Sequence, residues 1–410
     1  MAARAGDEMA GPALMLAGFA LSGSALDASS LLAGLTISAA VGGPVLGALL
    51  DRAERPGRLL AGALALYAAG LVAILVGLGR LPFALTLLIA VVAGLAGPAL
   101  SGGWTAQLPH VVADDRLPRA HALDAMTFSV AGLAGPALVG GVAETLGAPT
   151  AVVVSALLIA LALPAAWLLP ARSGHPARSG HPARSGHPVR ARVARTASVF
   201  GDLAAGVRVI LGRPSLARAT LTSVVSCIAQ GMLAACLPLL GERVLGEADR
   251  GAVLLSCAAF SALVAHAVLA RFPRSVAPDT IIWAGALVMA AAPALAMSGR
   301  PVVLIVGVLI AGLGEGALLA ALFAVRHREA PEQLRGQIFT TGASLKITGF
   351  ALGAAVAGPV VAWSLPGALA LAAGVAVLAA ALFFAIPRIP RTTRRTIRER
   401  RNAASARTGP

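Results

Sequence analysis

The chain has little charge for its length. Only 12% of its 410 residues are Asp, Glu, Lys or Arg, whereas about a quarter of the residues are charged in a water-soluble fold. Hydrophobic residues make up 58%, and the mean hydropathy is +0.83. A soluble protein of two or three domains is therefore excluded, and we expect lipid to be the solvent for most of the chain.

Cysteine is scarce and lysine is almost absent. Cys227, Cys236 and Cys257 are widely spaced in apolar runs, which suits neither a disulfide framework nor a zinc site. The only lysine, Lys346, lies inside an apolar run rather than in a P-loop, and neither His-Glu-x-x-His nor Gly-x-Ser-x-Gly occurs. We therefore predict no enzymatic activity, no metal and no cofactor.

The net charge of +15 is concentrated in two segments. Residues 171–218 carry nine arginines against one acid, and residues 388–410 carry eight against one, so these segments account for the whole excess. A nucleic-acid-binding protein spreads its basic residues over a folded face with aromatic residues among them. Arginines next to apolar runs are instead typical of cytoplasmic loops. We predict no nucleic-acid partner, and contact with anionic lipids of the inner leaflet.

Twelve apolar runs are long enough to cross a bilayer, which takes about 20 residues. The runs lie at 3–22, 30–50, 59–79, 83–106, 122–143, 149–169, 217–240, 251–270, 280–298, 301–325, 338–361 and 365–386. We therefore expect an all-α integral membrane protein with twelve transmembrane helices in two six-helix bundles. The bundles are residues 1–170 and 216–387, joined by a cytoplasmic linker at 171–215 and followed by a cytoplasmic tail at 388–410.

The orientation follows from the arginines of the loops. One set of alternate loops holds most of them, and the other set holds only Arg80, Arg243, Arg250 and Arg300. By the positive-inside rule the first set is cytoplasmic, so both termini are inside. The excess of arginine over lysine, with much alanine and glycine, is typical of a GC-rich bacterial genome, and we predict a multi-pass protein of the bacterial inner membrane.

The linker contains the sequence ARSGHP three times, at 171–188. A proline every six residues forbids a continuous helix, and the polar remainder cannot form a core. The neighbouring arginines disfavour metal binding by the repeated histidines. The next residues, 199–211, have apolar side chains at helical spacing, so we expect an amphipathic helix on the inner leaflet.

The first helix has two possible positions. It is either a minimal span over 11–28, or it starts at the terminus and places Arg4, Asp7 and Glu8 at membrane depth. The second position leaves open that the start codon clips the natural helix.

A charged motif follows the second apolar run. It reads Gly47-Ala-Leu-Leu-Asp51-Arg52, and Gly57-Arg58 comes five residues later. Together with twelve spans in a six-plus-six arrangement, this resembles the major facilitator superfamily, whose signature at this loop is glycine, a small residue, Asp-Arg and then Gly-Arg. Here four residues, 53–56, stand where the family usually has one. The helix count covers essentially the whole chain, and the motif covers one loop.

This resemblance implies a gating loop formed by Gly47, Asp51, Arg52 and Arg58. In it Asp51 faces the positive N-terminus of the eleventh helix, near Gly336, and holds the cytoplasmic side shut. The alternative is ordinary topogenic charge, which orients the chain without acting as a latch.

The fifth run contains a glycine-proline motif, similar to that of drug-exporting antiporters in the family: Gly132, Gly135, Pro136, Gly140 and Gly141. The fourth run has nearly the same string, AGLAGPALSGG at 93–103 against AGLAGPALVGG at 131–141. The likeness is therefore also explained by close helix approach and a proline bend. The arginine signature expected of exporters in the fourth helix is absent.

Ionisable residues inside apolar runs are costly, so each one calls for a role. Glu315 and Lys346 lie at equal depth on consecutive helices, which favours an ion pair or a shared cavity; a static pair that fixes packing is the alternative. Asp124 and His266 would reach an interface or a backbone carbonyl. The resemblance implies that helices 1, 4, 7 and 10 line a central cavity. The residues near the solute path would then be Asp7, Glu8, Gln230 and Glu315, with Lys346 beside them.

The predicted function is secondary transport by alternating access. A carboxylate removed from water is easier to protonate, so these acids can couple a proton to solute movement. We expect a monomer that performs proton-coupled efflux of a small apolar or amphipathic compound. Proton-coupled uptake of a small metabolite is the alternative within transport, and a non-transporting membrane scaffold is the alternative from another class.

Overall fold

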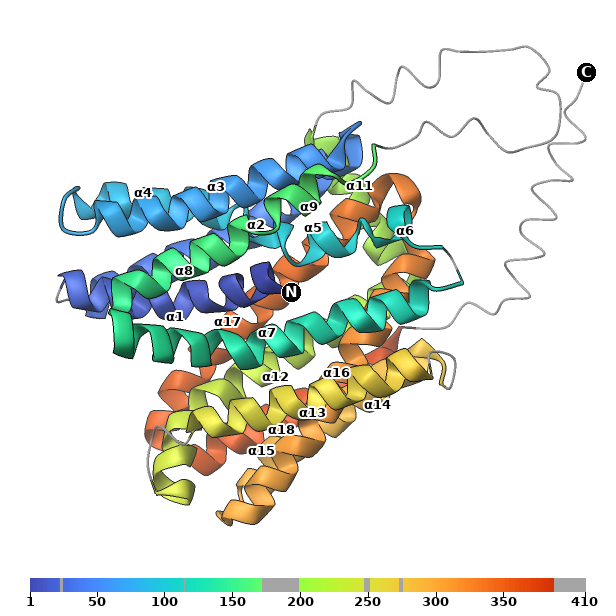
Figure 1. Ribbon diagram of the computed structural model, residues 1–410. Coiled ribbons are helices and arrows are strands. Elements are labelled where there is room, and N and C mark those ends of the chain that lie inside the picture. Colours follow the sequence, from blue (N-terminus) through green and yellow to red (C-terminus); the bar gives the residue numbers. More distant parts are fainter. Residues whose placement is uncertain (23–24, 114, 172–198, 247–250, 273–275, 387–410) are drawn as a thin grey trace, which may run out of the picture.

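The computed structural model describes residues 1–22, 25–113, 115–171, 199–246, 251–272 and 276–386, and these residues form helices and no strands. The long helices run side by side (Figure 1). Before the linker the helices, long and short, are α1 (Ala2–Ser22), α2 (Ala25–Arg52), α3 (Pro56–Gly77), α4 (Phe83–Gly94), η1 (Gly97–Ala99), α5 (Gly102–Thr105), α6 (Leu108–Val111), α7 (Leu117–Leu146), α8 (Ala148–Ala160) and α9 (Leu163–Trp167). After it they are α11 (Val199–Gly212), α12 (Pro214–Leu245), α13 (Gly251–Arg271), α14 (Pro278–Met289), α15 (Ala291–Ala296), α16 (Pro301–Glu329), η3 (Glu332–Leu334), α17 (Arg335–Trp363) and α18 (Leu365–Ala385).

The expected fold class is confirmed. Eleven helical stretches of the described residues are long and apolar enough to cross a membrane. The further long helix, α1, begins at Ala2 and contains Arg4, Asp7 and Glu8 near its start. Of the two positions predicted for the first helix, the structure therefore has the one that starts at the terminus and includes these three charges.

Three spans are interrupted, each at a proline. Pro98, Pro164 and Pro293 all lie four residues after the end of the preceding helix, α4, α8 and α14 respectively. A proline cannot donate the hydrogen bond to the carbonyl four residues earlier, and its ring crowds that carbonyl. Prolines at other positions, such as Pro136, lie in continuous helices.

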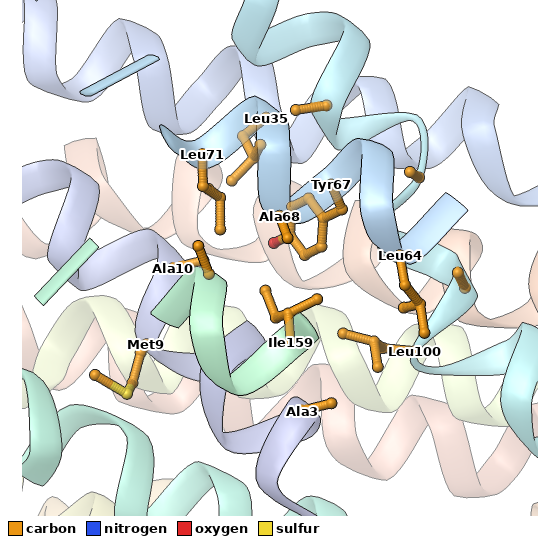
Figure 2. Packing of buried hydrophobic residues seen from close by; sticks show 14 of the residues in the cluster. Ala3, Met9, Ala10, Leu35, Leu64, Tyr67, Ala68, Leu71, Leu100 and Ile159 are labelled. Atoms are coloured by element: carbon orange, nitrogen blue, oxygen red, sulfur yellow. The ribbon is translucent and has the colours of Figure 1, made fainter. Parts of the chain in front are cut away.

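The helices before the linker pack around one large apolar core. Figure 2 shows Met9 and Ala10 of α1 with Tyr67 and Leu71 of α3 and Ile159 of α8. The helices after the linker pack around several smaller clusters. The two sets, which we call the N-half and the C-half, contact each other mainly through α2 against α17 and α7 against α13. In Figure 1 the blue-to-green N-half fills the upper part, and α13–α16 of the C-half lie below it.

Helix α11 forms where an amphipathic helix was expected and packs against α2, α12 and α17. Its Gly206 faces Gln337 so closely that a Cβ would collide with the amide. The ARSGHP repeats beyond Ala171 and the basic tail lie outside the described residues. The division into two bundles at 170 and 216, and the lipid contacts of α11, stay predictions.

Candidate functional site

A cavity of about 420 Å³ lies between the two halves. Its N-half wall comes from α1, α2, α3, α4, η1, α5 and α7, and its C-half wall comes from α16 and α17. The acidic and the basic residues of the cavity lie on opposite walls. Asp7, Glu8 and Tyr67 line the N-half wall, and Arg326 and Lys346 line the C-half wall. The cavity thus presents carboxylates on one side and cations on the other.

The carboxylates are held by the packing of α1. The Tyr67 hydroxyl donates to Asp7 Oδ1 at 2.9 Å, and the Ser155 hydroxyl of α8 donates to the Gly6 carbonyl at 2.6 Å. On the other side, Gly135 of α7 lies against Glu8, where an added Cβ would be 2.7 Å from the Glu8 Cβ. These contacts fix the height and rotation of α1, and Glu8 is left facing the cavity.

Gln230 and Glu315 lie in a second, smaller cavity of about 60 Å³ with apolar walls. Glu315 is close enough to interact electrostatically with Lys346 and with Glu8. Within the described residues, however, Glu315 and Lys346 form no ion pair. Of the two arrangements expected, the direct pair is therefore not formed, and the larger cavity holds Lys346 but not Glu315. The carboxylates of Asp7 and Glu8 therefore line the larger cavity, and that of Glu315 lines the smaller one.

A buried network that the sequence did not reveal joins α1 to α7. Arg4 forms an ion pair with Asp124 at 2.8 Å, and both side chains are 7% exposed. Arg4 also donates to the Leu100 carbonyl, to Thr105 and to Thr127, and its guanidinium lies 3.7 Å from the centre of the Phe128 ring. The other Asp124 oxygen accepts from Thr105 at 2.7 Å. Asp124 was expected at an interface or a backbone carbonyl; its partner is instead a buried arginine.

The two halves are joined at the end of the molecule where α2 and α16 end and α17 begins, which we call the arginine-rich end. Asp51 Oδ1 accepts from the Gly336 amide and Oδ2 from the Gln337 amide, both at 2.8 Å. A Cβ at Gly336 would be 2.8 Å from Asp51 Oδ1, so glycine allows this approach. Asp51 thus lies where the resemblance implied, at the positive end of α17.

The other residues of the predicted gating loop do not all lie at this contact. Gly47 packs so closely on α17 that a Cβ there would be 2.9 Å from the Gln337 amide nitrogen. Arg52 follows Asp51 at the end of α2. Arg58 lies apart, with its guanidinium 5.2 Å from the Trp167 ring centre. The structure therefore brings Gly47 and Asp51 together with α17, and places Arg58 against the end of the sixth span.

A cluster of aromatic rings lies between the halves, on the stretches of α7, α16 and α17 towards the arginine-rich end. His121 and Phe128 come from α7, Phe323 from α16 and Phe339 from α17. The ring centres of Phe128 and Phe323, and of Phe323 and Phe339, are 6.0 Å apart, and His121 stacks on Phe339 at 6.4 Å. Because the rings come from both halves, this cluster must separate if the arginine-rich end is to open.

The glycine-proline motif of α7 makes only one close contact. Gly132, Gly140 and Gly141 have no described neighbour within 4 Å of an added Cβ, and only Gly135 approaches another helix. Pro136 lies in the continuous helix α7. In the similar string of the fourth span, Gly94 and Gly102 both touch neighbouring backbone, and the helix breaks before Pro98.

Comparison with known proteins points to one family. The model described as Major Facilitator Superfamily matches residues 1–340. No curated protein sequence matches. Among solved structures, the human organic anion transporter MFSD10 (TETRAN) is similar at 16% identity and a TM-score of 0.69, covering 93% of this chain and 97% of that one.

Two sugar symporters are similar as well. The proton:xylose symporter XylE has 12% identity and a TM-score of 0.70, with 94% of each chain covered. The E. coli fucose:proton symporter FucP has 16% identity and a TM-score of 0.64, with 95% and 97% covered. At identities of 12–16% these structures show a shared fold alone. The family model matches the sequence itself, over residues 1–340. With its two helical halves around a central cavity, the chain belongs to the Major Facilitator Superfamily of membrane transporters.

Proposed function

We propose that this chain is a proton-coupled secondary transporter that exports a small apolar or amphipathic compound. The observation that carries the proposal is the central cavity, where Asp7 and Glu8 face Arg326 and Lys346 between the two halves. Glu315 interacts with Glu8 and Lys346 from the adjoining cavity. Ionisable residues at membrane depth mark solute and proton pathways.

In this mechanism the two halves rock around the cavity. The contacts of Asp51 with α17 and the aromatic cluster hold the arginine-rich end closed, and this end is cytoplasmic in the proposed orientation. Opening it breaks two charge-assisted hydrogen bonds and separates the Phe128 and Phe323 rings. Protonation of Glu8 or Glu315 removes a charge whose burial is costly, and so favours the closed states that hide these groups from water.

Export is supported by the resemblance of the glycine-proline motif to that of drug antiporters. Uptake is the second candidate, because two solved structures of similar fold are described as proton symporters. The two directions differ in the sign of the proton movement that accompanies the solute. The cytoplasmic termini, the bacterial inner membrane and the monomeric state belong to this proposal.

The experiment is proton movement in inverted membrane vesicles acidified inside. An exporter should release protons from the lumen when a substrate is added, whereas a symporter that works in uptake should release none under this gradient. Glu8→Gln and Glu315→Gln should each abolish proton release. Glu144→Gln is the matched control, because this exposed carboxylate lies near the far end of α7 and lines neither cavity. A scaffold would show no response to any compound, and that result would refute the proposal.

A further inference from the structure

Arg326 is a buried arginine whose guanidinium is left partly unsatisfied by the described residues. The residue is 2% exposed, although it lines the central cavity near the end of α16. Its Nε and Nη2 atoms are buried and make no hydrogen bond with any described residue. None of the ion pairs in the described part of the chain includes it. A guanidinium in this state lacks the charge and the acceptors that burial requires.

The space around Arg326 is shaped for its guanidinium. Gly342 of α17 lies directly against it, and a Cβ at this position would collide with three guanidinium atoms. The unpaired group is therefore accommodated by backbone that comes close only because residue 342 has no side chain. Lys346 is four residues further along α17, so it lies on the same face of the helix and lines the same cavity.

Aromatic rings line the same cavity as these two cations. Phe128, Phe323 and Phe339 line the cavity together with Arg326, and Lys346 lies further along α17. An anionic group at Arg326 would thus have aromatic surface next to it for an apolar body. The carboxylates of Asp7 and Glu8 occupy the opposite wall and repel an anion there. The charge pattern fixes where the anionic end of a solute can lie.

We propose that Arg326, with Lys346 beside it, binds the anionic group of the transported solute, and that the solute is an amphipathic organic anion such as an aromatic carboxylate or sulfonate. This inference rests on the proposed function only in taking the central cavity as the solute site. A planar guanidinium matches two oxygens of such a group at once, which Lys346, as a single ammonium, cannot do.

Binding to the purified protein tests this directly. The probes are matched pairs that differ in charge but little in shape: naphthalene-2-sulfonate with naphthalene-2-sulfonamide, and 2-naphthoate with 2-naphthamide. Affinity is measured by calorimetric titration in a nonionic detergent. We expect each anion to bind at least about tenfold more tightly than its neutral counterpart, since hydrogen bonds to charged groups are the stronger ones.

Variants locate the preference. Arg326→Gln should weaken anion binding by about ten- to a hundredfold and leave the neutral probe unchanged. Arg326→Lys should keep part of the preference. Arg218→Gln is the matched control, because Arg218 is a buried arginine of the same half that stacks on Phe383 and does not line the cavity. It should keep the full preference for the anion.

The wild-type protein alone can overturn the inference, whatever the variants do. If the neutral probe of every pair binds as tightly as the anion, or if no anion binds, then Arg326 is not an anion site. Proton release with neutral solutes in the vesicle assay would still support the proposed transport. Failure of the transport proposal is instead the absence of proton release with any compound, which the titration does not measure.

Discussion

Two buried arginines, one in each half, have opposite surroundings. Arg4 is 5% exposed and Arg326 is 2% exposed. Arg4 has an ion pair with Asp124, backbone and hydroxyl acceptors, and an aromatic ring against its face. Arg326 lines the cavity, and no described residue accepts a hydrogen bond from its Nε or Nη2.

The difference separates a structural charge from a functional one. Burying a charge is tolerated when partners within the protein replace the lost water. Arg4 meets this condition with groups from two other spans of its own half, the fourth span and α7, so the folded protein itself explains its position. Among the described residues Arg326 does not meet it for its Nε and Nη2 atoms, and this is why we assign its partner to the solute. The exposed fraction alone does not distinguish the two arginines, because it is nearly the same for both.

The largest expected effect is the loss of the Arg4 network. Arg4→Leu removes the partner of Asp124 and leaves a buried carboxylate uncompensated, which typically costs about 3–5 kcal/mol. We expect a large fall in the thermal unfolding midpoint of the purified protein, measured by fluorescence in detergent. Arg116→Leu, at an exposed arginine of the same end, is the control and should change the midpoint little.

The double variant Arg4→Leu, Asp124→Leu sharpens this result. A buried pair replaced by apolar side chains is often as stable as the original. The double variant should therefore recover much of the midpoint that the single variant loses. A double variant less stable than Arg4→Leu would show that the two side chains are not coupled as the 2.8 Å distance indicates.

The Asp51 carboxylate accepts its hydrogen bonds from the other half, so we expect its loss to change how often the arginine-rich end opens more than the stability of the fold. Asp51→Asn puts an NH₂ group opposite one of the two amides of α17 and removes the negative charge at the helix terminus. Hydrogen bonds to charged groups are worth about 1.5–3 kcal/mol. We expect opening at the arginine-rich end to become about tenfold more frequent, as about 1.4 kcal/mol corresponds to a factor of ten.

The measurement is maleimide labelling of Ala343→Cys, which lines the cavity, in a chain whose native cysteines are replaced by alanine. A membrane-impermeant reagent is added from the arginine-rich side, and Asp51→Asn should speed labelling. Asp115→Asn, an exposed acid at the same end, is the control. Equal labelling rates in all three proteins would leave Asp51 as ordinary topogenic charge.

A smaller loss of stability than that of Arg4→Leu is expected at the second contact between α7 and α1. Gly135→Ala forces α1 away at Glu8, because an added Cβ would be 2.7 Å from the Glu8 Cβ. Overpacking of this kind typically costs about 1–3 kcal/mol. Gly132→Ala is one turn earlier on the same helix and meets open space. The unfolding midpoint should fall for the first variant and stay or rise slightly for the second; equal midpoints would refute the contact.

The sequence predicted the number of long helices and the place of Asp51, because both depend on local composition or on a motif at a defined loop. It also named Asp7, Glu8 and Lys346, which line one cavity. It did not predict the partner of Asp124, since Arg4 is 120 residues away and neither residue has a spacing that indicates the other. The signal available was that two opposite charges lie in different apolar runs.

Arg326 was also missed, for a different reason. It lies near the arginine-rich end of its span, where arginine is expected as topogenic charge, and its neighbours Arg328 and Glu329 do pair with each other. Only the depth of burial and the missing partner distinguish it, and both are properties of the packed halves. The breaks before Pro98, Pro164 and Pro293 show the same limit, since Pro136 bears the same neighbours as Pro98 without a break.

The smallest change in stability is expected at Arg326, and its sign tests the comparison of the two arginines. Arg326→Met keeps a long apolar stem and removes a buried cation that has no described partner. An unsatisfied buried polar group costs about 1–3 kcal/mol, so its removal should leave the unfolding midpoint unchanged or raise it. The measurement is the same thermal unfolding in detergent, without added anions, since a bound anion would stabilise the wild type by mass action. A fall as large as that of Arg4→Leu would mean that Arg326 holds the fold as Arg4 does. A midpoint that stays or rises, together with loss of the anion preference, fits a cation kept for a solute rather than for the fold.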